Sequence, residues 1–431
     1  MVVRLIVLTY FALLFVAEAV SDLADSHALA VLFLLPAAGY ATWRVTLAAT
    51  HFALRKDGQR PMATGQLAAA VLVYVALYSL LYLPRGETAL AAMRGFVTLF
   101  VHTAFWHAAF CAPAYRGERR KRFFADLLCS LFLGTVVGAG FALAYTGWSF
   151  EPGSVHDLSG RAPGVRSDLD VPFLALLLGV WGIVILFVRR RFRGTVAGVG
   201  RVLRSPLLGI ALVGCCVAVL VLYGRRTPLI ALVTAGAFLV VPGAVGRKLA
   251  YLAVLFPFVP LAWDMVAAVL LRVTQNSLAA AILVRNDPDD YLTGTNRLYV
   301  WMASLDYLSE PRFGHLVGFG GAPGFLLQNT ADWTHTHNAY LQLVFDAGVP
   351  VLVLALAILV TALRRVSLAI SLDRQPYCAY VLLGLLVAWL VTSGVEPTLR
   401  SLALPHLVFI LLTLVAANLL WGLPRRRAPA R

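Results

Sequence analysis

The sequence predicts an all-α integral membrane protein, and three observations lead to this fold class. First, 60% of the 431 residues are hydrophobic and 13% are charged, whereas soluble domains have roughly 45–50% apolar and about 25% charged residues. Second, the apolar residues form runs of about 20, the length of a helix that crosses a bilayer. Third, the runs are continuous and rich in Leu and Ala, which favours helices over alternating strands.

About twelve segments are long enough for transmembrane helices. They lie at residues 3–20, 28–48, 66–84, 89–112, 125–147, 171–188, 206–223, 228–246, 249–271, 338–363, 377–395 and 401–421. The first segment is evenly apolar, and no small-x-small cleavage site follows it. We therefore expect a first transmembrane helix there and no cleavable signal peptide.

The distribution of basic residues predicts the orientation of these helices. With twelve crossings, one set of short connections carries every lysine and most arginines, as in RGERRKR (116–122) and RRRFR (189–193). By the positive-inside rule this side is cytoplasmic, and both termini lie on it. The alternation is unbroken along the chain, which supports the number of segments. The net charge of +15 therefore indicates membrane topology rather than nucleic-acid binding.

Two long connections fall on the external or periplasmic side, at about 148–170 and 272–337. A connection as long as the second is typically functional or disordered. Its aromatic residues, its glycines and a helical stretch at 297–308 favour an ordered, functional loop. The prediction thus divides the chain into helices one to nine (1–271), a large outer loop (272–337), and helices ten to twelve with a short basic tail (338–431).

The outer side carries arginines but no lysine, against the positive-inside rule. Arg225 and Arg226 lie in LYGRRTPLIAL (222–232), Arg297 lies in TGTNRLYVW (293–301), and Arg400 ends GVEPTLR (394–400). A guanidinium grips phosphate through two parallel hydrogen bonds. These arginines therefore indicate an anionic ligand, such as a lipid-linked pyrophosphate. The alternative is that they reach lipid phosphates at the membrane surface.

Two further stretches bear polar or conformationally free residues. HLVGFGGAPG (315–324) contains Gly318 and Gly320, which allow a tight loop close to a ligand or a nest for phosphate, although no P-loop lysine follows. Glu396 lies beside Arg400 in the outer turn. It is either a spare base or a salt-bridge partner of that arginine.

His335 and His337 precede the apolar run from 338, and three interpretations are open. They could bind a metal, although no third ligand lies at a standard spacing. They could simply occupy the interface, while Thr336 or Asn338 caps the following helix. Or His337 could activate an acceptor hydroxyl beside arginines that bind phosphate.

The sequence around these residues resembles the O-antigen ligase and O-antigen polymerase superfamily. THTHNAYLQLVFDAGVPV (334–351) resembles the His-Asn-x-x-Leu…Gly signature of the family. LYGRRTPLIAL resembles its Ser-Arg-x-x-x-Leu segment, and NRLYVWMASLDYLSEPRFGHLVGFGG (296–321) resembles its Arg…Trp…Gly-x-Gly segment. The three motifs occur in the order of the family and cover roughly residues 220–360.

The resemblance implies roles for individual residues. His337, Arg297 and Arg226 match the catalytic histidine and the pyrophosphate-binding arginines. Arg225, Asn338, His335, Gly318, Gly320, Arg400 and Glu396 are expected to bind substrate. Arg225 stands where the family often has a small or hydroxyl residue, so either member of the Arg225–Arg226 pair is a candidate. Neither a metal ion nor another cofactor is expected.

The resemblance also implies the reaction. We expect a GT-C-like membrane glycosyltransferase of the bacterial inner membrane, with its active site facing the periplasm. A ligase of this kind transfers a glycan from undecaprenyl pyrophosphate to the lipid A–core oligosaccharide, without metal and with inversion. A polymerase uses the same donor and adds the glycan to another lipid-linked repeat. A protein O-oligosaccharyltransferase and a transporter of an anionic lipid or solute remain as further alternatives.

Overall fold

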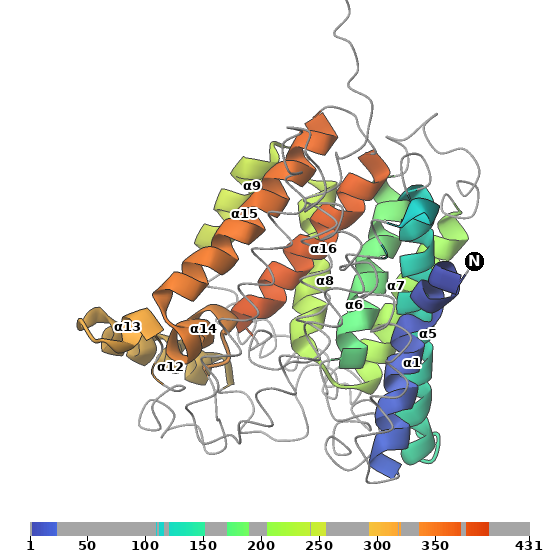
Figure 1. The fold of residues 1–431 in the computed structure, drawn as a ribbon, viewed down its shortest axis with the longest axis horizontal. Helices are drawn as coiled ribbons and strands as arrows, with labels where there is room; N and C mark the ends of the chain where they lie inside the picture. The colour runs from blue at the N-terminus through green and yellow to red at the C-terminus, as the bar shows by residue number, and fades with distance from the viewer. Residues whose placement is uncertain are drawn as a thin grey trace, which may run out of the picture.

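The structure is a computed structural model, and it describes residues 2–23, 109, 112–115, 120–150, 170–188, 205–241, 243–255, 293–317, 319, 336–371 and 376–395. Every regular element within these ranges is helical (Figure 1). The helices are α1 (Val2–Leu23), η1 (Pro113–Tyr115), α5 (Arg120–Tyr145), α6 (Asp170–Ile183), the π-helical η4 (Val184–Val188), α7 (Pro206–Leu222), α8 (Arg226–Val240), α9 (Val245–Leu255), α12 (Thr293–Ser309), α13 (Gly314–Val317), α14 (Ala339–Ala347), α15 (Val349–Ser371) and α16 (Pro376–Val395).

Three helices in the described part of the chain are long and apolar enough to cross a membrane, judged by length and composition. They are Arg122–Tyr145, Val349–Ser371 and Tyr377–Gly394, and four shorter apolar helices accompany them. This agrees with an integral membrane protein. The predicted spans 28–48, 66–84 and 401–421 and most of 89–112 and of 249–271 lie outside the described residues, so the total of twelve stays a prediction.

The helix predicted over 228–246 ends earlier, at Val240, and the boundaries of the predicted span 338–363 are wrong. The sequence predicts a single helix over 338–363, but the chain forms α14 and then α15, with Gly348 between them. Gly348 has φ +86°, a backbone conformation that ends a helix. The span in this region is therefore α15, and α14 is a separate short helix in front of it.

Helices α1 and α5 run parallel and are joined by polar contacts. The carboxylate of Asp126 in α5 accepts hydrogen bonds from the Arg4 guanidinium at 2.8 and 3.0 Å and from the Tyr115 hydroxyl at 2.8 Å. Further along, the glycine at 134 lies against Phe11, and Gly138 lies beside Phe15. The parallel direction matches the predicted alternation, in which the first and fifth segments start on one side.

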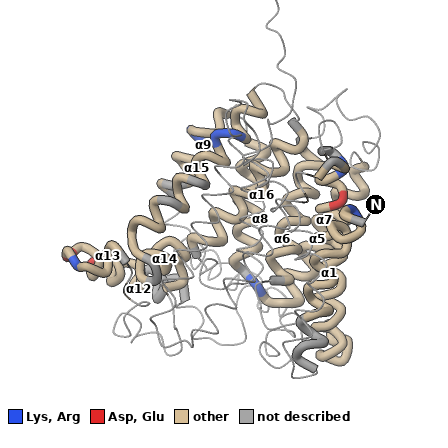
Figure 2. Tube along the Cα trace, viewed as in Figure 1, with Lys and Arg blue, Asp and Glu red and all other residues tan. Residues whose placement is uncertain are grey.

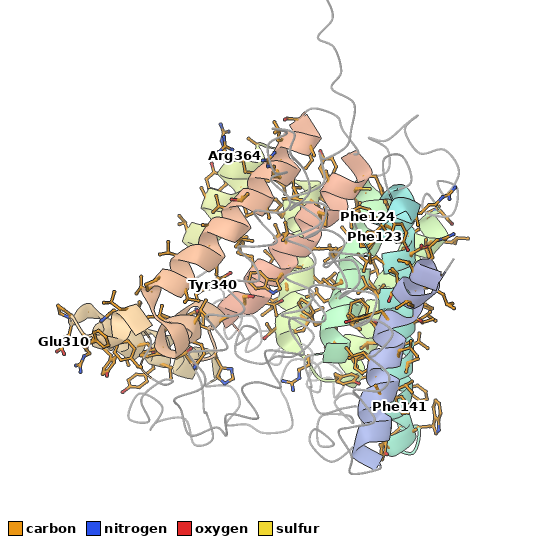
Figure 3. The ribbon with its side chains drawn as sticks, in the orientation of Figure 1. Phe123, Phe124, Phe141, Glu310, Tyr340 and Arg364 are labelled. Atoms are coloured by element: carbon orange, nitrogen blue, oxygen red, sulfur yellow. The ribbon has the colours of Figure 1, made fainter. Side chains whose placement is uncertain are left out.

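The centre of the bundle is built from α6, α7, α8 and α16. Small residues allow close approach between α6 and α7, since a Cβ added to Gly182 would lie 2.7 Å from the carbonyl oxygen of Gly209. Trp181 is fully buried and donates its indole N–H to the Tyr377 hydroxyl of α16 at 2.6 Å. Phe123 and Phe124 extend this aromatic core into α5 (Figure 3).

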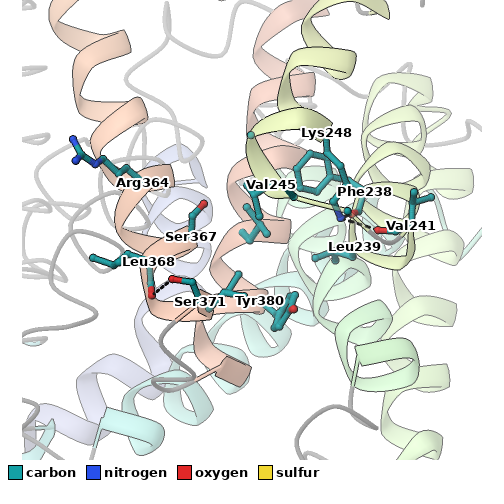
Figure 4. A pocket seen from close by; sticks show the side chains of 15 residues that line it. Phe238, Leu239, Val241, Val245, Lys248, Arg364, Ser367, Leu368, Ser371 and Tyr380 are labelled. Carbon is teal, nitrogen blue, oxygen red and sulfur yellow. Dashed lines mark hydrogen bonds between the residues drawn. The ribbon is translucent and has the colours of Figure 1, made fainter. Parts of the chain in front are cut away.

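One end of the bundle surrounds a cavity of about 550 Å³, lined by the C-terminal ends of α8 and α15 and the N-terminal turns of α9 and α16 (Figure 4). Lys248 in α9 donates hydrogen bonds from its ammonium group to the carbonyl oxygens of Phe238 and Val241, at the end of α8. Lys and Arg residues lie along α9 and α15 at this end (Figure 2), and Lys248 and Arg364 line the cavity. We call it the basic end.

The topology separates the basic end from the outer motifs. Because α8 ends at the cavity, its first residue, Arg226, lies at the opposite end of that helix. The same reasoning applies to Val349, the first residue of α15. The α7–α8 turn and the α14–α15 junction therefore share the end of the bundle that faces away from the basic end (Figure 1). We call this the motif end.

Candidate active site

The turn that precedes α14 carries His337 in an unusual backbone conformation. Its φ is +48°, and it is one of two non-glycine residues with positive φ among those described. Left-handed backbone costs a residue with a side chain on the order of 1–3 kcal/mol and persists only where its surroundings impose it. The imidazole ring is half-buried, and its Nδ1 atom is buried. The histidine is thus held in a fixed, strained position at the motif end.

Asn338 caps α14. Its side-chain oxygen accepts hydrogen bonds from the backbone N–H groups of Tyr340 and Leu341 at 3.0 and 3.1 Å. This is the geometry of an N-cap, which satisfies donors that lack partners within the helix. The structure thus confirms the predicted cap at 338. The substrate-binding role of Asn338 stays a prediction, and its oxygen is already engaged by the helix.

The residue on the other side, Thr336, is fully buried and explains how the strained turn is held. Its backbone N–H donates to Oε1 of the buried Gln342 side chain at 3.0 Å. Its hydroxyl donates to the carbonyl oxygen of Asn338 at 3.0 Å. Its own carbonyl oxygen accepts from the Trp301 indole N–H at 3.0 Å. Three separate hydrogen bonds therefore fix the backbone next to His337.

Trp301 connects this turn to the helix that contains Arg297. Both residues belong to α12, and Arg297 precedes Trp301 by four positions. The sequence stretch at 297–308, predicted to be helical, is confirmed within α12. The helix that carries the candidate pyrophosphate-binding arginine is thus fastened to the candidate catalytic turn.

Gly348 fastens the same region from the other side. A Cβ at this position would lie 2.8 Å from the backbone carbonyl of Leu316 in α13. Nearby, the backbone N–H of Phe319 donates to the carbonyl oxygen of Phe345 in α14 at 2.6 Å. The signature glycine therefore has two physical requirements, positive φ and close approach of α13, and both exclude a side chain.

The second arginine motif forms the turn between α7 and α8. Gly224 has φ +60°, and Arg225 is the N-cap residue of α8, with its backbone N–H bonded to the carbonyl oxygen of Leu220 at 3.0 Å. The Arg225 side chain is half-buried and its Nε atom is buried. Arg226 begins the helix. The predicted outer turn is confirmed as a tight turn, and the choice between the two arginines stays open.

The helix α16 lies between the two motifs. It contacts both α14 and α8, and the Tyr340 hydroxyl donates to the carbonyl oxygen of Leu390 in α16 at 3.4 Å. Burial raises the pKa of the Tyr340 phenol above its ordinary value, so this hydroxyl stays a hydrogen-bond donor near neutral pH. The structure thus brings the His337 turn and the arginine turn to one end of the bundle through a shared helix.

Several predicted site residues lie outside the described residues: His335, Gly318, Gly320, Glu396 and Arg400. Sequence reasoning missed the roles of Thr336, Gln342 and Trp301 in holding the turn. Gln342 carried a usable signal, since it is a lone amide in the apolar run YLQLVF (340–345). No group of three or more His, Cys, Asp or Glu side chains in the described part of the chain is arranged to hold a metal ion. The metal interpretation of the two histidines remains untested, because His335 is not described.

The fold and the candidate site together define a class of protein. It is a helical protein with membrane-spanning segments, and its strained histidine turn and its Arg225–Arg226 turn share the motif end, opposite to the basic end. Residues 204–356 match the family model described as O-antigen ligase, which supports the O-antigen ligase superfamily for this segment of the chain. The matched segment begins just before α7 and ends in the second turn of α15, so it contains all three motifs. No curated protein matches the chain.

The match of this segment supports a role of the ligase and polymerase family, in lipopolysaccharide biosynthesis and as a membrane enzyme of the glycosyltransferase type. It agrees with the resemblance on which the sequence interpretation rests. The GT-C-like fold stays a prediction.

Proposed function

We propose that the protein is an O-antigen ligase that transfers a glycan from undecaprenyl pyrophosphate to the lipid A–core oligosaccharide on the periplasmic face of the inner membrane. One observation carries the proposal. Within the family segment, His337 is held in left-handed backbone by a buried network that also joins it to the arginine-bearing helix α12. Strain of this kind concentrates at functional sites, where the surroundings over-determine the geometry.

The reaction requires two opposite kinds of assistance. An acceptor hydroxyl attacks the anomeric carbon, a new glycosidic C–O bond forms, and the bond from that carbon to the pyrophosphate oxygen breaks. Attack and departure on opposite faces invert the anomeric centre. The hydroxyl loses a proton, and negative charge grows on the departing pyrophosphate. The enzyme therefore needs a proton acceptor near the hydroxyl and positive groups near the leaving oxygen.

We assign the proton acceptor to Nε2 of His337, because Nδ1 is buried. An imidazole titrates near neutral pH, which suits a general base. Its fixed backbone favours this role, since a base contributes most when it is held in place before the reaction. In this assignment the proton transfer needs no metal ion, and the histidine acts only on the acceptor hydroxyl.

We assign Arg297 and the Arg225–Arg226 turn to the pyrophosphate. Guanidinium groups bind phosphate oxygens in pairs of parallel hydrogen bonds and keep their charge throughout the reaction. These arginines lie at the motif end, away from the basic end. This location favours phosphate binding over a role in setting the orientation of the helices in the membrane. In this arrangement the arginines act on the leaving group, while the histidine acts on the opposite face of the sugar.

The test is genetic and biochemical. The gene is deleted in its host, the lipopolysaccharide is separated by electrophoresis, and the strain is complemented with wild type, His337→Ala, Arg297→Ala or Arg312→Ala. Arg312 is an exposed arginine in the connection between α12 and α13, so Arg312→Ala is the matched control. A ligase predicts loss of all glycan-bearing bands with accumulation of lipid-linked polymer. Only wild type and Arg312→Ala should restore the bands.

Other outcomes would redirect the proposal. A surviving band of core plus one repeat identifies a polymerase, which uses the same donor and a different acceptor. An unchanged profile contradicts both activities and supports the transporter. Purified protein supplied with lipid-linked donor and acceptor completes the test, because a transporter yields no glycosidic product.

A further inference from the structure

The helix α12 has one side that packs on the site and another that is exposed. Val300, Trp301 and Ser304 are buried, and Trp301 bonds to Thr336 next to His337. On the opposite side Tyr299, Met302 and Leu305 are 50%, 64% and 58% exposed. These positions are three apart and therefore form one stripe. Asp306 shares this face toward the C-terminal end, so the face is amphipathic.

Two more large apolar side chains are exposed just after α12, one before α13 and one within it. Phe313 is 76% exposed and Leu316 is 61% exposed. Together with α12, this short segment exposes five large apolar side chains. Water-facing surfaces seldom present contiguous apolar areas of this kind, and such areas mark contacts with a partner or with lipid. We call α12 and α13 with their connection the arm.

The location of the arm identifies what covers it. Helix α13 contacts both α14 and α15, and the backbone of Leu316 rests on Gly348, directly before the first residue of α15. Along α15, Val353 and Val360 are exposed and form the side expected to face lipid. The exposed residues of the arm therefore adjoin a lipid-facing surface, at the depth where the span begins.

The shape of the arm agrees with this depth. It extends sideways from the foot of α15, away from the rest of the bundle (Figures 1 and 2). Its far end carries charge, since Arg312 forms an ion pair with Glu310 and lies over the Tyr307 ring at 4.3 Å (Figure 3). Apolar residues beside the span and an ion pair at the tip match the boundary between acyl chains and headgroups.

We propose that the arm lies on the membrane at the motif end, with its apolar stripe in contact with the acyl chains of glycerophospholipids. The opposite side of α12 bonds through Trp301 to the turn of His337. Contact with lipid therefore sets the height of that turn above the membrane. The lipid contact is independent of the catalytic assignment. A failure of the lipid contact leaves the proposed function intact, and a failure of the proposed function leaves the lipid contact intact.

The experiment measures depth by fluorescence quenching. Met302→Cys, Phe313→Cys and Glu310→Cys are made in a cysteine-free background, labelled with bimane and placed in nanodiscs of phosphatidylethanolamine and phosphatidylglycerol. Lipids with a doxyl quencher report contact with acyl chains, and iodide reports contact with water. Glu310→Cys is the control within the arm, because it lies at the charged tip.

We expect lipid quenching at Met302→Cys and Phe313→Cys to be at least about threefold stronger than at Glu310→Cys, with the order reversed for iodide. Equal iodide quenching at all three positions would overturn the proposal. Protection from both quenchers at Phe313→Cys would also overturn it, because that result indicates a protein partner. All three positions are exposed, so the substitutions leave the packing of the arm in place.

Discussion

The indole N–H of Trp301 donates a hydrogen bond to the carbonyl oxygen of Thr336 at 3.0 Å, and this bond joins α12 to the turn of His337. The two residues are 35 positions apart, and the contact is buried. The bond therefore couples α12, which contains Arg297, to the turn that contains His337. Neither motif alone determines this geometry.

Removing this bond should slow the reaction. Trp301→Phe keeps most of the ring but loses the donor, so the backbone beside His337 is held by fewer contacts. We expect a loss of about 10–100-fold in glycan transfer, the range found when reacting groups shift slightly. Transfer is measured with purified protein at saturating donor. Trp148→Phe, at an exposed tryptophan after α5, is the control, and an equal effect at both positions would refute the coupling.

Gln342→Met tests the second contact. The substitution preserves the volume of the side chain but leaves the buried N–H of Thr336 without its acceptor, at a cost of about 1–3 kcal/mol. We expect a lower thermal transition in detergent and reduced transfer. Leu343→Met places the same side chain at the next buried position, where such a swap usually costs less than about 1.5 kcal/mol. The idea fails if Leu343→Met is as damaging as Gln342→Met.

His337 should separate stability from activity. Because φ is +48°, glycine relieves the backbone strain whereas alanine keeps it. We expect His337→Gly to be more stable than His337→Ala by about 1 kcal/mol, and both to be inactive. Thermal unfolding and glycan transfer are measured on the same preparations. Activity in either variant would remove the histidine from the mechanism without affecting the strain argument.

Gly348→Ala should be strongly destabilising. Its Cβ would meet the Leu316 backbone at 2.8 Å in a positive-φ conformation, so either α13 must move or α14 must turn. We expect a loss of more than about 2 kcal/mol, seen as a lower thermal transition and poor recovery from the membrane. Gly214→Ala in α7 has open space around the added Cβ and should be neutral or stabilising.

The ion pair between α1 and α5 should contribute to stability but not to the reaction. Asp126→Asn retains the shape of the side chain and removes its charge from the Arg4 and Tyr115 contacts. Because the Arg4 side chain is 44% exposed, solvent screens part of the loss, and we expect about 1–2 kcal/mol. Unchanged transfer per folded molecule is expected. Asp306→Asn, an exposed change, is the control in the same thermal assay.

The sequence was sufficient to predict the helices whose apolar runs match the membrane thickness. Segments such as 206–223 and 377–395 reappear as α7 and α16 within one residue, because length and composition determine them. The division at Gly348 was missed, since α14 is as apolar as a span. Hydropathy carries no information about a positive φ. The glycine in FDAGVPV (345–351) was the residue in the sequence that indicated a break in the helix.

The candidate site was predictable in part. Motif spacing indicated His337, its neighbouring cap and the two arginine segments, and the cap is confirmed. The network of Trp301, Thr336 and Gln342 was not predictable, because its members are separated by up to 41 positions and meet only after the outer loop has folded. A single sequence contains no record of such a contact.

The interruption at Gly348 also affects how the protein meets membranes of different thickness. Helix α15 has 23 residues, about 34 Å of helix, which exceeds a hydrocarbon core of roughly 30 Å. Such a helix adapts by tilting, and the tilt changes with bilayer thickness. A continuous helix from 338 would carry His337 along with each change. Because the chain turns at Gly348 while α14 contacts α12 and α13, we expect α15 to change its tilt with bilayer thickness without moving the turn of His337.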